Sequence, residues 1–335
     1  MQIRTLGHSG LKVSRLCLGT MMFGDRTDEA EARRILDHAR ESGVDFLDTA
    51  DMYAAGRSEE MVGRLIAQDR DAWVLATKAG NPVPGVARSA GLSRAWLMRA
   101  IDGSLKRLGT DRVDLWYLHL DDRITPVEET VTAVGDAIRA GMVLYWGFSN
   151  FEGWQIADMV HTADKLGVPR PVACQPLYNA LNRQAERDIL PACDRFGIGV
   201  MPYSPLARGM LTGKYASIDA PPEDSRAARA DKRMLETEFR AESVEIAGRF
   251  KAHAKRRGRS LVDFALGWLL ANDIVTSVVA GPRTLDQWQG YVAAARSPFD
   301  AEDEAVVEAQ VAPGHSSTPG YNDPRYPLRG RRTVF

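Results

Sequence analysis

The sequence predicts an α/β fold, a closed (β/α)₈ barrel (TIM barrel) that forms one domain over residues 1–335. Short apolar segments of strand length recur along the chain, and longer amphipathic segments separate them. Alternating β and α segments require parallel strands joined by right-handed crossovers. The sequence lacks the GxGxxG pattern of dinucleotide-binding open sheets, which favours a barrel over a doubly wound sheet. The eight predicted strands are residues 16–18, 46–47, 73–77, 113–119, 143–149, 172–175, 198–202 and 275–279.

Amphipathic helices are predicted between these strands. In DEAEARRILDHARESG (residues 28–43), apolar residues such as Ile35 and Leu36 share one face, and Gly43 ends the helix. Similar patterns occupy residues 93–109, 126–141 and 186–197.

Three further segments fall outside the repeat. Residues 3–14 (IRTLGHSGLKVS) predict a hairpin with its turn at residues 8–10, placed to cap the bottom of the barrel. Residues 206–236 and the extended C-terminal tail, residues 311–335, are rich in Gly, Pro, Ser or charge. Both are too long for simple connectors, so we expect functional loops at the active face.

The composition is that of an ordinary globular protein, with 44% hydrophobic and 26% charged residues. Lys plus Arg (43) nearly balance Asp plus Glu (44), so no overall basic field is present to hold nucleic acid. We interpret the basic run at residues 251–259 as the solvated face of a helix. Cys17, Cys174 and Cys193 form no CxxC motif, and the N-terminus shows no apolar signal segment. We therefore expect a cytoplasmic protein without a membrane partner.

Polar residues end four of the predicted strands. They are Asp48, Lys78, His119 and the pair Ser149 and Asn150. Each alone has a structural interpretation, as a cap, a solvated side chain or a core histidine. Because the carboxyl ends of barrel strands form the active face, their shared position favours an active site.

A proton donor is predicted near these strand ends. Tyr53 lies five residues past Asp48, and its phenol, with an ordinary pKa of about 10, needs a nearby ammonium to lower that pKa. Lys78 is the candidate ammonium, and Asp48 would keep it charged in a desolvated site. His119 would donate a hydrogen bond to a substrate oxygen. Asp51 has no role in this arrangement, and we expect a solvated loop residue.

These motifs resemble one known family. The segments DTADMY, ATK and LHLDD occur in order, and the similarity runs from RTLGHSGLKVSRLCLGTMMFG to VVAGPRTLDQ. The chain resembles the aldo-keto reductases, NADPH-dependent (β/α)₈ barrels with an Asp, Tyr, Lys and His tetrad. The details resemble the branch of aryl-alcohol dehydrogenases, potassium-channel β subunits and glyceraldehyde-phosphate reductases. The resemblance implies that the catalytic residues are Asp48, Tyr53, Lys78 and His119.

The resemblance also implies NADPH or NADP⁺ as the cofactor, with NADH less favoured. It places the nicotinamide amide on Ser149, Asn150 and Gln175, with the ring stacked on Tyr203. The other implied cofactor contacts are Gly19, Thr20 and Met21 near the ribose, Asp48, the loop residues Ser204, Pro205, Leu206, Arg208 and Lys214 over the pyrophosphate, and Arg226, Gly281, Arg283 and Gln287 toward the adenosine end.

Arg283 suggests the 2′-phosphate of NADP, because a planar guanidinium suits phosphate bidentately. Arg226 is either a second phosphate contact or a solvated arginine. The sequence departs from the family at Gly290 and Tyr291, where an acidic residue and an asparagine are common, which leaves adenine recognition open. The six histidines show no metal-ligand spacing such as HExxH, so no metal is expected.

The predicted activity is reversible reduction of an aldehyde or ketone. One alternative is an NADP(H)-binding regulatory or redox-sensor subunit with slow turnover, although the chain has no long extra N-terminal segment to act on a channel. A second is a lyase that uses Lys78 as a Schiff base. A short-chain dehydrogenase is disfavoured, because no tyrosine precedes a lysine by four residues.

The substrate pocket is predicted only in outline. Trp116 is interpreted as core, and Tyr321 and Tyr326 of the tail either fold over the mouth as a lid or stay disordered. An apolar wall would favour aryl aldehydes or bulky polycyclic ketones and alcohols, whereas a charged wall would favour sugars or hydroxyaldehydes. Homo-oligomers are possible. The candidate wall residues are Met22, Phe23, Asp121, Asp122 and Arg123.

Overall fold

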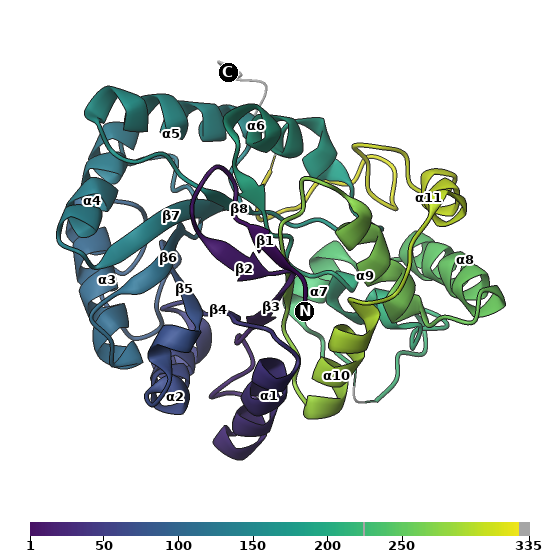
Figure 1. The fold of residues 1–335 in the computed structure, drawn as a ribbon. Helices are drawn as coiled ribbons and strands as arrows, with labels where there is room; N and C mark the ends of the chain where they lie inside the picture. Colours follow the sequence, from purple (N-terminus) through teal and green to yellow (C-terminus); the bar gives the residue numbers. More distant parts are fainter. Residues whose placement is uncertain (224, 328–335) are drawn as a thin grey trace.

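The computed structural model describes residues 1–223 and 225–327 and confirms the predicted barrel (Figure 1). Eight parallel strands form one sheet in the order β10, β3, β4, β5, β6, β7, β8, β9. A parallel bridge between Val200 and Val275 closes the sheet beside β10. The strands of the barrel are β3 (Leu16–Gly19), β4 (Phe46–Asp48), β5 (Val74–Ala79), β6 (Val113–Leu118), β7 (Val143–Ser149), β8 (Ala173–Gln175), β9 (Gly199–Val200) and β10 (Val278–Ala280).

The helices surround the strands as an outer ring, and α8 and α11 lie together on one flank beyond α9 (Figure 1). Asp28 caps the start of α1, where its carboxylate accepts a hydrogen bond of 2.9 Å from the Glu31 amide. Within the described residues no helix is long and apolar enough to cross a membrane. The helices are α1 (Glu29–Glu41), α2 (Arg57–Ile66), α3 (Arg94–Leu108), α4 (Val127–Arg139), α5 (Gly153–Leu166), α6 (Ile189–Phe196), α7 (Lys232–Thr237), α8 (Ala241–Arg256), α9 (Leu261–Ala271), α10 (Leu285–Ala294) and α11 (Ala301–Glu308), with short 3₁₀ helices η1 (Tyr53–Gly56), η2 (Arg70–Ala72), η3 (Gln184–Arg187) and η4 (Ala207–Thr212).

The predicted N-terminal hairpin closes one end of the barrel. Strands β1 (Ile3–Thr5) and β2 (Lys12–Ser14) pair antiparallel and cross the barrel axis (Figure 1). Gly7, at φ +54°, packs so closely that a Cβ would lie 2.6 Å from the Val172 carbonyl oxygen. Val172 precedes β8, so the hairpin covers the ends where the strands begin. The opposite end, where the strands finish, is left for the active site.

Two apolar layers hold the fold together. The larger layer lies between the strands and the helices and includes Trp116, which is 1% exposed, so its assignment to the core is confirmed. The smaller layer fills the barrel, and Leu6 from the hairpin region joins it. The fully buried residues of this inner layer are Leu6, Val13, Cys17, Phe46, Ala76, Leu115, Tyr117, Ala173 and Met201.

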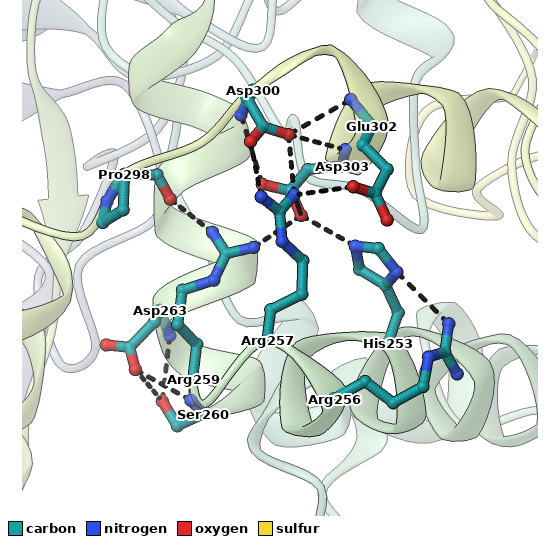
Figure 2. Close-up of polar contacts among 10 residues, drawn as sticks. All are labelled: His253, Arg256, Arg257, Arg259, Ser260, Asp263, Pro298, Asp300, Glu302 and Asp303. Carbon is teal, nitrogen blue, oxygen red and sulfur yellow. Dashed lines mark hydrogen bonds and ion pairs between the residues drawn. The ribbon is translucent and has the colours of Figure 1, made fainter.

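The basic run at residues 251–259 is only partly the solvated helix face that the sequence predicted. Figure 2 shows His253, Arg257 and Arg259 converging on Asp303, whose side chain is fully buried. Arg257 also forms a bidentate pair with Asp300, at 2.7 and 2.6 Å. The run therefore attaches the end of α8 to the start of α11, because a buried carboxylate requires cationic partners.

Candidate active site

Asp48 and Lys78 meet inside the barrel because they lie at the ends of neighbouring strands. Asp48 is the last residue of β4 and pairs in register with Ala76 of β5, two residues before Lys78. The Lys78 ammonium is fully buried, donates to Oδ1 of Asp48 and donates a second hydrogen bond of 2.7 Å to the Thr49 carbonyl. Charge and hydrogen bonds together make this burial tolerable.

The other oxygen of Asp48 faces across the barrel. Gln175, the last residue of β8, donates from Nε2 to Oδ2 of Asp48 at 2.8 Å. Asp48 is 2% exposed, and both of its oxygens accept from fixed donors. The carboxylate is therefore held in one orientation beneath the mouth.

Tyr53 returns to Lys78 because the chain turns sharply after β4. Ala54 and Ala55 occupy the left-handed region at φ 50° and 56°, and Gly56 follows at φ 93°. A left-handed conformation costs a non-glycine residue roughly 1–2 kcal/mol. This strained turn brings the Tyr53 hydroxyl within 3.4 Å of the Lys78 ammonium.

The electrostatics of this pair differ from the expected lowered phenol pKa. Burial raises the pKa of Tyr53 above its ordinary value, and Lys78 opposes the rise without overcoming it. For Lys78, burial lowers the pKa, but Asp48 and Tyr53 raise it by more, so the pKa is raised overall. Near neutral pH the phenol is therefore protonated and the ammonium charged.

His119 follows β6 and faces Tyr53. Their ring centroids are 6.0 Å apart and the rings are nearly perpendicular, at 83°. Burial, with smaller contributions from Lys78 and Arg325, holds the pKa of His119 well below 6.5. The imidazole is therefore neutral and retains one N–H to donate.

A second set of polar groups lies beside this cluster. Ser149 ends β7 and donates to the Gln175 carbonyl at 2.8 Å. Asn150, in a left-handed conformation at φ 61°, donates to the His119 carbonyl at 2.9 Å. Tyr203 donates from its hydroxyl to Oδ1 of Asn150 at 2.8 Å. The structure thus brings Ser149, Asn150, Gln175 and Tyr203 together at one side of the site.

The loop that starts at Ser204 has a strained backbone. Ser204, Ala207 and Arg208 lie at φ 57°, 46° and 53°, and Asn179 fixes the loop by donating to the Ser204 carbonyl at 3.1 Å. Three left-handed non-glycine residues in five positions are unusual, and strain of this kind gathers at ligand sites. The loop lies beside Tyr203 at the active face.

Cations gather beyond this loop. The pKa of Lys214 is lowered by burial and by the charges of Arg226, Arg229 and Arg283, so these four residues lie within electrostatic range of one another. Arg226 has one long ion pair, 3.7 Å to Asp231, and burial is the main cause of its lowered pKa. The four residues thus form a group of neighbouring cations beside the loop.

The residues predicted for the adenosine end lie in the same region. Gln287 accepts from the Arg283 amide at 2.8 Å, which orders the segment before α10. The charge of nearby Arg226 lowers the pKa of Tyr291, but burial has the larger effect and raises that pKa to about 12. Tyr291 therefore places a phenol ring near this cation. Gly19 and Gly281 approach each other closely at the neighbouring strand ends.

Asp51 contradicts its sequence prediction as a solvated loop residue. Its side chain is fully buried, and neither carboxyl oxygen has a hydrogen-bond partner in the described part of the chain. Burial, and then the charge of Glu59, raise the pKa of Asp51 to about 8. Glu59 is also fully buried but accepts from Arg107 at 2.7 Å. The turn after β4 thus buries Asp51 within electrostatic range of Glu59, which belongs to α2.

The predicted wall residues have mainly structural partners. Phe23 is fully buried in the outer apolar layer, so it cannot line an open pocket. Asp122 accepts from the amides of Leu92, Ile124 and Thr125 and fixes its own loop. Arg123 pairs with Glu152 at 2.6 Å. Asp121 accepts from the Gln155 side chain. Met22 remains half-buried.

The described part of the tail packs over the mouth, which resolves the alternatives for Tyr321 and Tyr326 in favour of a folded segment. Asp323 forms a bidentate pair with Arg233 at 2.6 and 2.9 Å. Tyr321 lies under the Arg240 guanidinium, 3.6 Å from its ring centroid. Tyr326 is near enough to Tyr203 for its charge to affect the pKa of that phenol. Residues 328–335 lie outside the described residues.

Asn81 and Arg325 were not anticipated from the sequence. Arg325 donates to Oδ1 of Asn81 at 2.6 Å, which joins the tail to the segment after β5. Asn81 was detectable as one more polar residue just past a strand end, whereas Arg325 gave no signal in the sequence. Both stand close to the Lys78 and His119 cluster.

The fold and the polar cluster at its active face define an oxidoreductase barrel, and the comparisons with known proteins show its family. Residues 15–311 match the aldo/keto reductase family, and the chain belongs to that family. It is similar to an uncharacterized oxidoreductase, YrpG, of Bacillus subtilis, with 38% identity over 90% of this chain and 93% of the relative. It is 39% identical to a probable voltage-gated potassium channel subunit beta of Arabidopsis thaliana, over 86% and 89% of the two chains. L-glyceraldehyde 3-phosphate reductase of Escherichia coli O157:H7 is 35% identical, over 94% and 93%.

Proposed function

We propose that the protein is an NADP-dependent alcohol dehydrogenase and carbonyl reductase, in which Tyr53 is the proton donor. The observation that carries this proposal is the buried chain of contacts from Asp48 through Lys78 to the Tyr53 hydroxyl, with a neutral His119 facing it. Family membership supports reduction of a carbonyl group in general. The residue roles are our assignment.

The residues fit a nicotinamide cofactor. Tyr203 and Asn150 form a hydrogen-bonded pair beside the tetrad, suited to a stacked ring and its amide. The charges of Arg226 and Arg283 lower the pKa of Lys214, and a bound phosphate would offset this repulsion. In this proposal the 2′-phosphate is held by Arg226 and Arg283, and the bound cofactor supplies the hydride.

The protein residues then control the proton and the position of the substrate. His119 donates its N–H to the carbonyl oxygen and orients it beside Tyr53. As the carbonyl carbon accepts the hydride, the C=O π electrons move to oxygen, and the Tyr53 O–H proton bonds to that oxygen. The phenolate left behind is stabilised by the charged Lys78 at 3.4 Å. Alcohol oxidation is the reverse.

Replacement of Tyr53 by Phe tests the proposal. We expect turnover of any carbonyl substrate to fall by roughly 10²-fold or more, the range of a general acid. NADPH binding, measured by quenching of protein fluorescence, should persist because the hydroxyl is the only group removed. Normal turnover with intact cofactor binding would show that the donor is another group.

A regulatory subunit that holds NADP(H) but turns over slowly is the second candidate, favoured by the similarity to potassium channel β subunits. Both functions use the same cofactor site, so cofactor binding does not distinguish them. Multiple-turnover kinetics over a panel of aryl, sugar and polycyclic carbonyls does.

A further inference from the structure

Arg325 brings a positive charge to the mouth of the barrel. The tail carries it there, and its guanidinium donates to Oδ1 of Asn81, a residue 2% exposed and three positions past Lys78. The guanidinium also lies 5.7 Å from the centroid of the Tyr326 ring, which limits its movement. Its charge reaches His119, which faces Tyr53. The arginine thus stands beside the position assigned to the reacting carbonyl.

This guanidinium lacks an acidic partner within the described residues. Its one side-chain acceptor there is the neutral amide oxygen of Asn81. The acid nearest in sequence, Asp323, is bound on both oxygens by Arg233 and accepts only the backbone amide of Arg325. Arg233 and Arg123, by contrast, are both ion-paired.

The acids of the loop after His119 also have other partners. Asp122 accepts three backbone amides and the Thr125 hydroxyl, and Asp121 accepts from Gln155. Glu152 forms an ion pair with Arg123. A guanidinium carries five N–H donors in a planar fork, so one bond to Asn81 leaves donors for a carboxylate or phosphate.

We propose that Arg325 binds an oxyanion on the substrate, and that the protein therefore reduces aldehydes or ketones that carry a carboxylate or phosphate group. This inference rests on the proposed carbonyl reduction and specifies its substrate class. The carbonyl lies between Tyr53 and His119, and the oxyanion lies against Arg325 and the edge of the tail. Arg325 is thus a specificity-determining residue and takes no part in proton transfer.

Matched substrate pairs test the inference. For a carboxylate, 4-formylbenzoate is compared with its methyl ester, and for a phosphate, glyceraldehyde 3-phosphate with glyceraldehyde. We expect kcat/KM to favour the anionic member of at least one pair, mainly through KM, and the pair that shows this identifies the oxyanion. The preference should weaken as salt rises, since this arginine is exposed.

Two arginine variants separate the inference from general electrostatics. Arg325→Gln should reduce the anionic-to-neutral ratio of kcat/KM by roughly tenfold to 100-fold, the size of a hydrogen bond to a charged group, and Arg325→Lys should restore part of it. Arg123→Gln, at the same mouth but paired with Glu152, should leave the ratio unchanged.

The outcomes also distinguish this inference from the function beneath it. Reduction of neutral and anionic members with a ratio that Arg325→Gln does not change overturns the anion site and leaves carbonyl reduction standing. A fall of equal size in Arg123→Gln also overturns it, because bulk charge then explains the preference. No reduction of any carbonyl in the wider panel overturns both.

Discussion

Gln175 donates a 2.8 Å hydrogen bond to the oxygen of Asp48 that Lys78 leaves free. The two donors come from opposite sides of the barrel, because Gln175 ends β8 whereas Lys78 lies on β5. Asp48 is therefore the junction between the proposed proton-donor group and the proposed nicotinamide site. A change at Asp48 should affect both.

Asp48→Asn is expected to uncouple this junction. The substitution leaves the Lys78 ammonium buried without a counter-charge, which destabilises the charged form by about 3–5 kcal/mol. The pKa of Lys78 should therefore fall. We expect kcat to drop by roughly 10²-fold or more and its pH profile to shift, since a neutral amine no longer stabilises a phenolate. A kcat–pH profile between pH 5 and about 9 measures this. An unchanged profile in a folded, NADPH-binding variant would contradict the assigned role.

The buried acid Asp51 predicts an unusual dependence of stability on pH. Its pKa is raised from 3.8 to about 8 in the folded state, so between these values the unfolded chain loses the proton and the folded chain keeps it. The contribution of Asp51 to the free energy of unfolding therefore falls as pH rises from about 4 to about 8, then levels off. Each pKa unit corresponds to about 1.4 kcal/mol.

Asp51→Asn removes this titration. We expect the variant to gain stability relative to the parent as pH rises, by up to a few kcal/mol at pH 8 and little at pH 4. Denaturant unfolding of both proteins at several pH values measures the difference. Glu59→Gln is the comparison, because Glu59 is bound by Arg107 and its loss should destabilise. A stability difference that is flat with pH would show that Asp51 ionises normally.

The barrel and the positions of its polar strand ends were predictable from sequence because both depend on local pattern. Apolar runs of strand length and turn residues place Asp48 and Lys78 at adjacent strand ends, and the parallel register brings them together. The same reasoning failed for Asp51, since its burial depends on the left-handed turn at Ala54 and Ala55. Both positions are alanine, so no glycine indicates a left-handed turn there.

Long-range contacts explain the other misses. His253 and Asp303 lie fifty positions apart, so a basic run that looks solvated in sequence in fact holds a buried acid. Arg325 reaches Asn81 across 244 positions. Neither pairing leaves a periodic or spaced pattern in the sequence. The direction of the pKa shift of Tyr53 was also not predictable, because it depends on how deeply the phenol is buried.

The cation group predicts NADPH preference. Arg226→Ala and Arg283→Ala should each raise KM for NADPH by roughly tenfold to 100-fold, because each removes a charged hydrogen bond to the 2′-phosphate. KM for NADH, which lacks this phosphate, should change little and serves as the control within each variant. Equal losses with both cofactors would place these arginines elsewhere than at the 2′-phosphate.

The ion pair between Arg233 and Asp323 predicts coupling between the tail and the long segment after Tyr203. Arg233 belongs to α7, in the long segment after Tyr203, and Asp323 belongs to the tail. Asp323→Asn should weaken both contacts, loosen the tail and increase KM for the carbonyl substrate several-fold. Limited proteolysis should show faster cleavage in the tail. Lys106→Gln, which breaks an exposed pair with Asp102 on α3, is the control and should change neither.

The cluster around Asp303 predicts where stability is concentrated on the outer flank (Figure 2). Asp303 is fully buried and accepts from His253 at 2.7 Å and from Arg257 at 3.0 Å. Burial raises its pKa, but Arg259 and His253 lower it by more, so the pKa is lowered overall. Its contribution to stability is therefore present above its ordinary pKa and lost as pH falls through the lowered value.

Asp303→Asn should cost about 3–5 kcal/mol at neutral pH, because it leaves buried cationic partners without a counter-charge. Asp300→Asn is the matched control in the same cluster. Its side chain is 53% exposed, so losing its pair with Arg257 and part of its cap on α11 should cost much less stability than the change at Asp303. Thermal unfolding of the two variants measures the contrast. Turnover below the melting temperature should remain normal in both, since the cluster lies on the outer flank at α8 and α11, away from the barrel strands. Equal losses of stability would show that the burial of Asp303 does not increase its contribution to the free energy of unfolding.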